Sequence, residues 1–233
     1  TSPPDEEATY AITTRGGIED ITLEMIANDD VDAIRRIPIR LGRSAATTLY
    51  RFVFDILPTN AATSYDTTAL FHTNHANTDA SAVLSQSTLS AGRRKMRRQA
   101  AYGDTTDVLS IVPRYLIVPS DLEELAFQLC TSVVAVPATP AGPSDTPNIH
   151  RGMEPITVDY YTDSNDWYLI ADPMQTPTIE IGFYANQDAP ELFTQADNTV
   201  GSMFDADKLS FKIRHIYSGT VLDHRGFYRG ANT

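Results

Sequence analysis

Two histidines, His72 and His75, come nearest of all residues in this chain to the types and spacing of a metal site. A pair three residues apart can share one ion on a helix or a turn, but a complete zinc site needs a third or fourth ligand and supporting hydrogen bonds. No HExxH sequence is present to supply such a set. We therefore expect loop histidines that hydrogen-bond to backbone, and a metal-dependent hydrolase using His72 and His75 is kept as an alternative.

Other catalytic patterns are absent from the sequence. There is no GxSxG nucleophile elbow, no GxxxxGK[ST] phosphate loop and no GxGxxG dinucleotide fingerprint. The single cysteine, Cys130, lies in an apolar segment, which favours a place in the core. One cysteine also allows no disulfide within the chain. The sequence predicts that the protein is not an enzyme, with no catalytic residue, no metal and no cofactor.

A run of basic residues is the sharpest charge feature. Arg93, Arg94, Lys95, Arg97 and Arg98 place five positive charges within six residues of an expected helix. So many charges around one helix cannot all point into a core. The run is either a solvated face or a face toward nucleic acid or an acidic neighbour, and both interpretations stay open here. A second group of candidate interior or interface residues lies on another expected helix: Arg36, Arg40 and Arg43.

The chain as a whole is acidic although part of it is basic. Its 233 residues carry a net charge of −12, but the basic residues concentrate in 29–100, whereas 1–28 and 101–233 are acidic. A negatively charged protein repels nucleic acid at long range, although a local basic surface could still face phosphates. A hydrophobic share of 42% and a charged share of 21% are typical of a folded protein. No apolar run approaches the roughly 20 residues that cross a bilayer, so no membrane partner is expected.

The N-terminal region predicts a β-hairpin. Two β-prone runs flank Gly16 and Gly17, so the pattern indicates a hairpin over 10–24 that turns at the two glycines. An isolated hairpin is only marginally stable in water. This hairpin must therefore pack either on its own domain or on a neighbouring copy.

The remaining elements mix helices and strands. Asp29 and Asp30 are good N-caps for a long amphipathic helix over 29–57, and Pro38 predicts either a kink within it or a restart of the helix there. Its arginines fall largely off the apolar stripe, which makes one side of the helix basic. The pattern also predicts helices over 87–103 and 121–134, and strands over 111–118, 156–161, 167–171, 178–184, 209–218 and 220–228.

Several short motifs follow one another along almost the whole chain. They are ITLEMIANDD (21–30), IP (37–38), GRSAA (42–46), LFHTNHAN (70–77), the helix 89–99, PRYLIVP (113–119), WYLIADP (167–173) and FKIRH (211–215). Their order resembles the major head subunits of tailed bacteriophages of the Mu type, over residues 10–229. The resemblance implies an α+β fold of the Hong Kong-97 capsid type.

That fold implies a division of the chain into named parts. An N-terminal arm would cover 1–9, and an extended loop (E-loop) lying over the adjacent subunit would cover 10–28. A peripheral domain would follow over 29–107, with the spine helix at 29–57. An axial domain would cover 108–182, and 183–233 would return through the peripheral domain as a C-terminal strand. The E-loop residues expected to contact another subunit are Tyr10, Ile12, Arg15, Gly16, Gly17, Ile18 and Ile21.

The resemblance also implies a function. The chain would self-assemble into hexamers and pentamers of an icosahedral head shell around double-stranded DNA, held without sequence specificity. Further partners would be a decoration protein, a scaffold or prohead protease, and the portal. The protein would assemble in the host cytoplasm and reside in the virion. Alternatives are an encapsulin-like nanocompartment shell and a plain soluble binding protein.

Overall fold

The structure is a computed structural model that describes residues 7–28, 34–135 and 146–232. The described chain divides into two compact units. The first unit contains residues 57–180 and 220–232 together with 7–9, and the second contains 10–56 and 181–219. Each unit is described by itself below.

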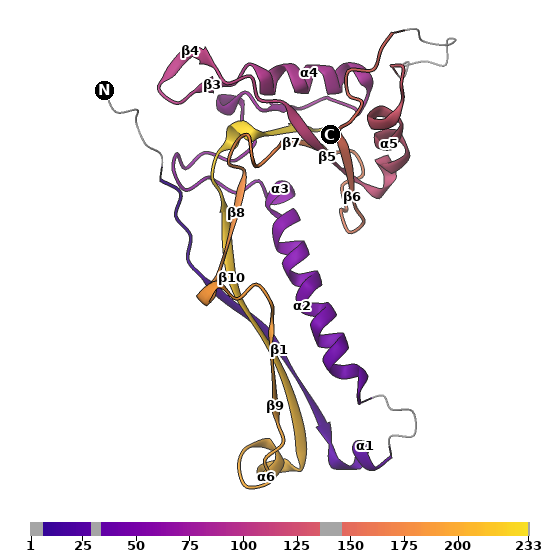
Figure 1. Cartoon of the computed structure of the whole chain (residues 1–233), viewed down its shortest axis with the longest axis vertical. Coiled ribbons are helices and arrows are strands. Elements are labelled where there is room, and N and C mark those ends of the chain that lie inside the picture. Colours follow the sequence, from indigo (N-terminus) through magenta and orange to yellow (C-terminus); the bar gives the residue numbers. More distant parts are fainter. Residues whose placement is uncertain (1–6, 29–33, 136–145, 233) are drawn as a thin grey trace. The chain divides into compact units, whose positions relative to one another are not determined.

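The second unit is an antiparallel sheet with one long helix packed against it (Figure 1). The central strand β10 (Lys208–Val221) pairs with β1 (Thr13–Thr22), with β9 (Glu191–Gln195) and with β8 (Ile179–Phe183). The long helix α2 (Arg36–Phe54) contacts β1. The short helices of this part of the chain are α1 (Leu23–Ala27), α6 (Ser202–Ala206) and α3 (Ile56–Thr59), which follows α2.

β1 runs without a break through Gly16 and Gly17, so the predicted turn and hairpin over 10–24 are wrong. Its partner strand comes from the other end of the sequence, because Thr13 lies opposite Tyr217 in β10. Gly16 is required for a different reason. A Cβ at that position would lie closer than 3.0 Å to the carbonyl oxygen of Ile213. A glycine in a strand can thus mark the close approach of another backbone rather than a turn.

The spine helix is shorter than predicted. α2 begins at Arg36, and the predicted caps Asp29 and Asp30 lie outside the described residues. Pro38 falls in the first turn, where a missing backbone N–H breaks no helical hydrogen bond, so the helix starts close to Pro38, as one of the two predicted outcomes requires, and has no kink there. The helix ends at Phe54 instead of Leu57, and Leu57 is buried in the following α3.

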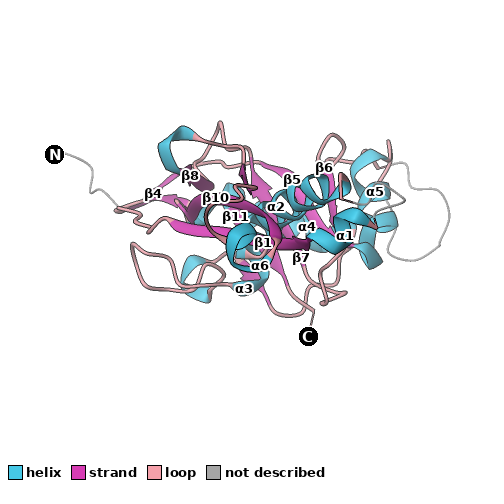
Figure 2. Ribbon diagram, turned by 90° about the horizontal axis from the view of Figure 1, so that it is seen from below, coloured by secondary structure: helices cyan, strands magenta, loops and turns pink. Residues whose placement is uncertain are grey.

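The first unit is built on a five-stranded mixed sheet. Its strand order is β2 (Thr78–Asp79), β11 (Phe227–Gly230), β7 (Trp167–Ala171), β5 (Pro113–Pro119) and β6 (Glu154–Val158). Helix α4 (Gln86–Arg97) packs on β11, and α5 (Glu123–Thr131) packs on β5 and β6. A separate two-stranded ribbon joins β3 (Ala100–Ala101) to β4 (Asp104–Val108). Figure 2 distinguishes these strands (magenta) from the helices (cyan).

Apolar side chains from the sheet and both helices form the core of this unit. Trp167 and Tyr228 are fully buried between α4 and the sheet, together with Leu89 and Met96 of α4. Cys130 joins this core as predicted, and burial raises the pKa of its thiol to about 11. The N-terminus of α4 is fixed by a capping box between Ser85 and Thr88.

Most predicted strands of this unit are confirmed, whereas helix ends differ. The predicted strands 111–118 and 167–171 correspond to β5 and β7. The two predicted helices end early, at Arg97 and Thr131. In the part of the chain that the structure describes, no helix is long and apolar enough to span a membrane.

The two units do not follow the predicted domain boundaries. Residues 58–107 were expected with the spine helix, but they lie in the same unit as 108–180 because α4 packs on that sheet. The names peripheral and axial domain, and the N-terminal arm over 1–9, stay predictions.

Candidate assembly surfaces

The predicted E-loop residues lie in β1 and in the segment just before it, and some of them are exposed whereas others are buried. Ile12 and Ile18 are 50% and 66% exposed, and the two glycines are exposed as well. Ile21 is only 1% exposed and belongs to the interior of its own unit. Tyr10 lies against Gly182, where any added Cβ would collide with its ring. The structure therefore leaves Ile12 and Ile18 available for contact with another molecule.

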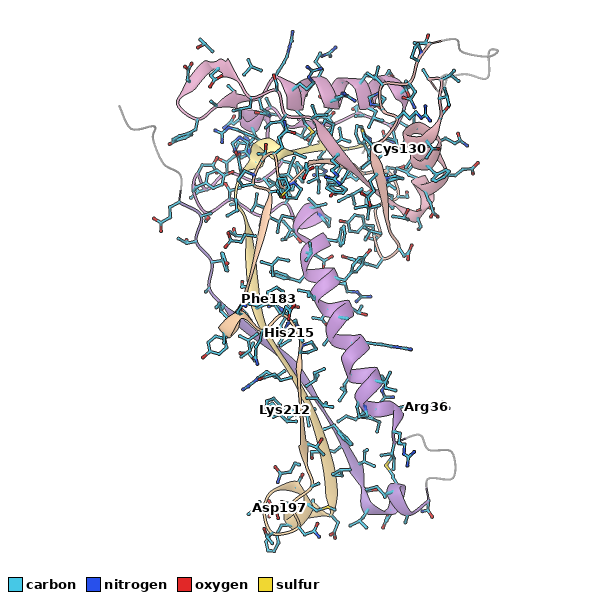
Figure 3. All side chains as sticks on the ribbon, viewed as in Figure 1. Arg36, Cys130, Phe183, Asp197, Lys212 and His215 are labelled. Carbon is cyan, nitrogen blue, oxygen red and sulfur yellow. The ribbon has the colours of Figure 1, made fainter. Side chains whose placement is uncertain are left out.

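The exposed face of the sheet carries a row of apolar and charged side chains. Ile18 lies opposite Lys212 in β10, and Lys212 lies opposite Phe193 in β9. Residues directly opposite in a sheet share a face, and Phe193 is 42% exposed beside the exposed Ile18. On the same face Arg214 forms an ion pair with Glu191 at 2.6 Å and lies over the Phe193 ring. We call Ile18, Lys212, Phe193, Arg214 and Glu191 the outer row; Lys212 is labelled in Figure 3.

Arg15 points away from the outer row and is used within its own unit. Its Nη1 donates to the carbonyl oxygen of Tyr217 at 2.7 Å. The guanidinium carbon lies 4.4 Å from the ring centroids of both Phe52 and Tyr217. Such cation–π contacts are strongest where water is excluded. Arg15 thus joins β1, β10 and α2 to one another.

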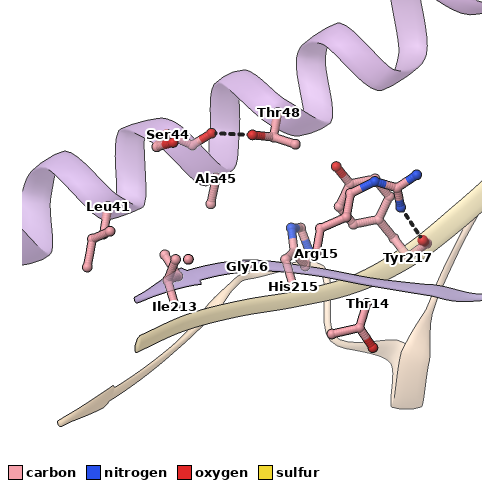
Figure 4. Close-up of a pocket in the computed structure, with 11 residues that line it drawn as sticks. Thr14, Arg15, Gly16, Leu41, Ser44, Ala45, Thr48, Ile213, His215 and Tyr217 are labelled. Carbon is pink, nitrogen blue, oxygen red and sulfur yellow. Dashed lines mark hydrogen bonds between the residues drawn. The ribbon is translucent and has the colours of Figure 1, made fainter. Parts of the chain in front are cut away.

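A hollow of ≈ 370 Å³ lies between α2 and the strands β1 and β10 (Figure 4). His215 and Tyr217 line it and are 6% and 0% exposed. Among the described residues, both ring nitrogens of His215 and the Tyr217 hydroxyl lack a hydrogen-bond partner. Burial raises the pKa of Tyr217. His215 also stacks on Phe183, with ring centroids 5.6 Å apart (Figure 3).

Sequence reasoning missed this hollow, although a signal existed. Ile213, His215 and Tyr217 alternate along one strand, and alternate residues of a strand share a face. A buried polar group without a partner costs about 1–3 kcal/mol. The hollow is therefore a position where an added hydrogen-bonding group would be stabilising.

The three predicted arginines of α2, Arg36, Arg40 and Arg43, are exposed, and Arg40 forms an ion pair. Arg40 forms an ion pair with Glu19 of β1, which fixes the helix to the strand. Arg36 and Arg43 are exposed, and Arg36 lies at the N-terminal end of the helix (Figure 3). The structure therefore does not gather the three predicted residues into one site.

The arginines of α4 are brought together. Arg93, Arg94, Arg97 and Arg98 all line one hollow of ≈ 350 Å³ in the first unit. Lys95 lies apart from them, because its Nζ donates to Asp79 Oδ1 at 2.7 Å and to the Thr78 carbonyl oxygen. The predicted five-charge run thus separates into one paired lysine and four arginines that share a site.

The two predicted loop histidines hydrogen-bond to backbone, as expected. His72 Nδ1 accepts from the Asn74 N–H at 3.1 Å, and His75 Nδ1 lies 3.0 Å from the Leu70 carbonyl oxygen. The two rings are nearly perpendicular with centroids 6.4 Å apart, and the group of metal-ligand-type atoms that lie together among the described residues includes His75 but not His72. A hydrolase built on His72 and His75 therefore has no geometric support.

His75 instead meets two residues that sequence reasoning missed, Asp66 and His224. Its Nε2 lies 2.7 Å from Asp66 Oδ2, and the His75 and His224 rings stack at 3.8 Å with an interplanar angle of 11°. The three residues place ligand-type atoms within 4.8 Å of one another. The signal was faint, because 149 positions separate His75 from His224 and only the fold brings them together.

Hydrogen bonds account for this cluster better than a metal ion does. Both His75 nitrogens lie within hydrogen-bond distance of an acceptor, the Leu70 carbonyl oxygen and the Asp66 carboxylate, so hydrogen bonds already occupy both ring atoms that could bind a metal. His224 Nδ1 lies 2.9 Å from the Tyr65 hydroxyl, which also accepts from the His224 backbone N–H. The lone pairs of parallel stacked rings point in parallel directions and cannot converge on one ion. The cluster is a hydrogen-bonded clamp between two distant chain segments.

The charges in the clamp shift its pKa values. Burial alone would raise the pKa of Asp66, but hydrogen bonds from Thr63 and His75 outweigh it and lower the pKa to about 2. Burial lowers the pKa of His224 to about 4, and the electrostatic influence of the neighbouring His75 acts in the same direction. Burial raises the pKa of Tyr65 to about 12. The clamp therefore holds His224 neutral at neutral pH.

Comparison with known proteins gives a family and a fold. A family model described as phage capsid protein matches residues 5–230. A structure from Mycobacterium phage Patience is similar with a TM-score of 0.61 and 11% identity, over 96% of this chain and 70% of that chain. A structure from Microbacterium phage Oxtober96 has a TM-score of 0.56 and 10% identity, over 94% and 72% of the two chains. Among curated proteins, no sequence matches.

A cellular shell protein is also similar. The holo-SrpI encapsulin complex from Synechococcus elongatus has a TM-score of 0.54 and 11% identity, over 96% of this chain and 75% of that chain. Identities this low show the fold alone, whereas the family match rests on the sequence itself. The predicted fold class is confirmed. The chain belongs to the phage capsid protein family, and it is a major capsid protein with the Hong Kong-97-type fold.

Proposed function

We propose that this protein forms the hexamers and pentamers of an icosahedral head shell that encloses the double-stranded DNA of a tailed bacteriophage. The family match over residues 5–230 is the observation that carries this proposal. The protein acts as a structural subunit of the virion capsid and not as an enzyme. It assembles in the host cytoplasm, and its further partners are a scaffold or prohead protease, a portal and a decoration protein.

The outer row supports a role in contacts between copies. Ile18 and Phe193 expose apolar surface on one face of the sheet, and apolar surface gains roughly 25 cal/mol per Å² when another molecule covers it. Lys212 and Arg214 on the same face suit charged partners that set the register of docking. Ile12 and Ile18 are therefore the predicted E-loop residues that we assign to another subunit. A shell repeats each such contact many times, so modest interfaces suffice.

Electron microscopy of the purified native protein tests the proposal. We expect closed shells hundreds of ångströms across, whereas a compact monomer of this length has a radius of gyration of roughly 17 Å. Light scattering on the same sample gives an independent size. A protein that stays monomeric under all conditions, including with its scaffold present, would contradict the proposal.

The encapsulin-like alternative keeps one specific observation in its favour, the similarity to the encapsulin complex. The contents of purified particles separate the two functions. Nuclease-protected double-stranded DNA inside the shells supports a phage head. Shells that hold protein and no DNA would instead make this chain a nanocompartment subunit.

Covalent reinforcement of the shell by lysine is not expected. The chain has three lysines, Lys95, Lys208 and Lys212, and none lies in 10–24. Lys95 is also held by Asp79. Intact-mass measurement on dissociated shells should give the mass of a single chain. Ladders of covalent multimers would show that one of the two β10 lysines forms a crosslink.

A further inference from the structure

The hollow beside α4 concentrates positive charge, although the charge of Arg94 also acts on Asp79. Four arginines line it, and the other lining residues are Ser90, Ser110 and Ile149, so the wall contains no acidic side chain. Within residues 7–28, 34–135 and 146–232, none of the four arginines lies within ion-pair distance of a carboxylate. Other arginines of this unit are paired, as Arg114 is with Asp172 and Arg229 with Asp166. We call Arg93, Arg94, Arg97 and Arg98 the arginine hollow.

The spacing of these arginines is unfavourable for the isolated helix. Arg93 and Arg97 are four residues apart, as are Arg94 and Arg98, and like charges at this spacing repel. Burial lowers the pKa of Arg93, and the charge of Arg97 lowers it further. The helix dipole favours positive charge in the last turn. However, the dipole explains neither Arg93, which lies before that turn, nor the convergence of four side chains on one hollow.

The arginine hollow is built on a rigid base. Leu89, Gly92 and Met96 bury the opposite side of α4 in the core. Arg93 Nη1 donates to the Ile149 carbonyl oxygen at 2.6 Å, which directs that guanidinium. A site whose donors are already positioned loses less conformational entropy on binding.

The chemistry of the hollow selects phosphates. A single carboxylate from a neighbour brings one negative charge and would leave most of the four arginines uncompensated. Duplex DNA brings one negative charge about every 1.7 Å along its axis, and guanidinium pairs with phosphate oxygens in a bidentate way. We infer that the arginine hollow binds the phosphate backbone of packaged duplex DNA. The choice of DNA as the source of the phosphates rests on the proposed function.

The arginine hollow is a locally basic site on a protein whose net charge is negative. The chain carries −12 overall and therefore repels DNA at long range. A local site of four arginines then holds the backbone weakly and without sequence preference. Weak contacts repeated over a whole shell position DNA and still permit its release.

The test measures binding of a fluorescent 20-base-pair duplex to the unassembled full chain at several salt concentrations. The variant is Arg97→Gln with Arg98→Gln. The matched control is Arg36→Gln with Arg43→Gln, which removes the same charge from exposed positions on α2. Each arginine that contacts a phosphate adds about one to the slope of log affinity against log salt. We expect the variant to lose about two from this slope and about tenfold or more in low-salt affinity, and the control to match wild type.

Three outcomes would overturn the inference. Equal losses in the variant and the control would mean that total charge, not the hollow, governs binding. Binding of inorganic phosphate that needs Arg97 and Arg98, with no binding of the duplex, would make the hollow a small-anion site. Unchanged duplex affinity combined with failed particle formation would make it an interface between copies. Failure of wild type to form shells would count against the proposed function and not against duplex binding.

Discussion

Replacing Gly16 with alanine should lower the free energy of unfolding by about 2–3 kcal/mol, whereas the same change at Gly17 should leave it within about 0.5 kcal/mol. The two positions are neighbours in one strand, yet their surroundings differ. A Cβ at Gly16 would lie closer than 3.0 Å to the backbone oxygen of Ile213, and backbone cannot move aside as a flexible side chain can. A Cβ at Gly17 meets nothing within 4 Å. Urea denaturation of the unassembled full chain, followed by far-ultraviolet circular dichroism, measures both values.

Gly17→Ala is therefore the matched control for the close approach of β1 to β10. Alanine is also slightly better than glycine in a strand, so Gly17→Ala could stabilise by a few tenths of a kcal/mol. The yield of shells should follow the same order, with fewer particles from Gly16→Ala. Equal stability of the two variants would mean that the strands do not approach as described. The Gly-Gly pair would then have to be explained by a turn.

The predicted hairpin was wrong because a local sequence pattern carries no information about a pairing partner that lies far away in the sequence. Two β-prone runs around Gly-Gly have the composition of a hairpin, but the partner of β1 lies about 200 positions later in β10. The extended backbone on either side of the glycines was predictable, since residues 13–14 and 18–22 fall within the two β-prone runs, but its continuation through Gly16 and Gly17 was not. The long-range pairing was not, because nothing in residues 10–24 specifies residue 213 as a neighbour.

For the spine helix, the sequence predicted the middle of the helix but not its ends. The periodic apolar residues predicted its middle correctly, and Leu41 is buried as that pattern requires. The predicted ends of the helix were wrong. At its N-terminal end the sequence was ambiguous, because a proline such as Pro38 is compatible both with a kink inside a helix and with a position in its first turn. In this chain the proline lies in the first turn.

The grouping of charged residues that are close together in the sequence could be predicted. Contacts between residues that only the fold brings together could not. The arginines of α4 lie within six residues, so the sequence already showed that one helix carries them and that they cannot all point into the core, but their convergence on one hollow came only with the structure. Their separation from Lys95 was not visible, because Asp79 reaches Lys95 only through the sheet edge at β2. The clamp of Asp66, His75 and His224 was likewise invisible, since its members come from two distant segments.

Acidification from pH 7.5 to pH 5 should lower the free energy of unfolding by about 2 kcal/mol for each of two buried histidines, His150 and His224. Burial lowers the pKa of His150 to about 4, aided by the charge of Arg93, and burial likewise lowers the pKa of His224 to about 4. An unfolded histidine has a pKa near 6.5. Between pH 6.5 and 4 these two histidines therefore bind protons in the unfolded chain but stay neutral in the folded chain. The free energy of unfolding consequently falls as the pH is lowered.

The structure explains why His150 resists protonation. It is 0% exposed, and the Ser90 hydroxyl already donates to the Gln86 carbonyl oxygen, so it accepts from His150 Nε2–H at 3.0 Å. Nδ1 then carries no proton, and it has no partner in the described part of the chain. A proton added there would bury a second positive charge beside Arg93 without an acceptor to receive it.

His224 faces more charges than His150 does. The groups around it are His75 and Arg225, which oppose its protonation, and Asp223 and Asp66, which favour it. Below pH 3.8 a second loss should begin, because the pKa of Asp66 is lowered to about 2 in the folded chain. Protonation of Asp66 removes the carboxylate that pairs with His75, and the clamp then opens.

Urea denaturation at a series of pH values measures these effects on the unassembled full chain. His150→Gln should reduce the loss between pH 7.5 and 5 by about 2 kcal/mol relative to wild type, whatever its stability at pH 7.5. His72→Gln removes a loop imidazole of the same unit and should keep the full loss. If all three proteins lose stability by the same amount, a source other than the buried His150 governs the acid response. If wild type is equally stable at both pH values, neither histidine is held neutral by the fold.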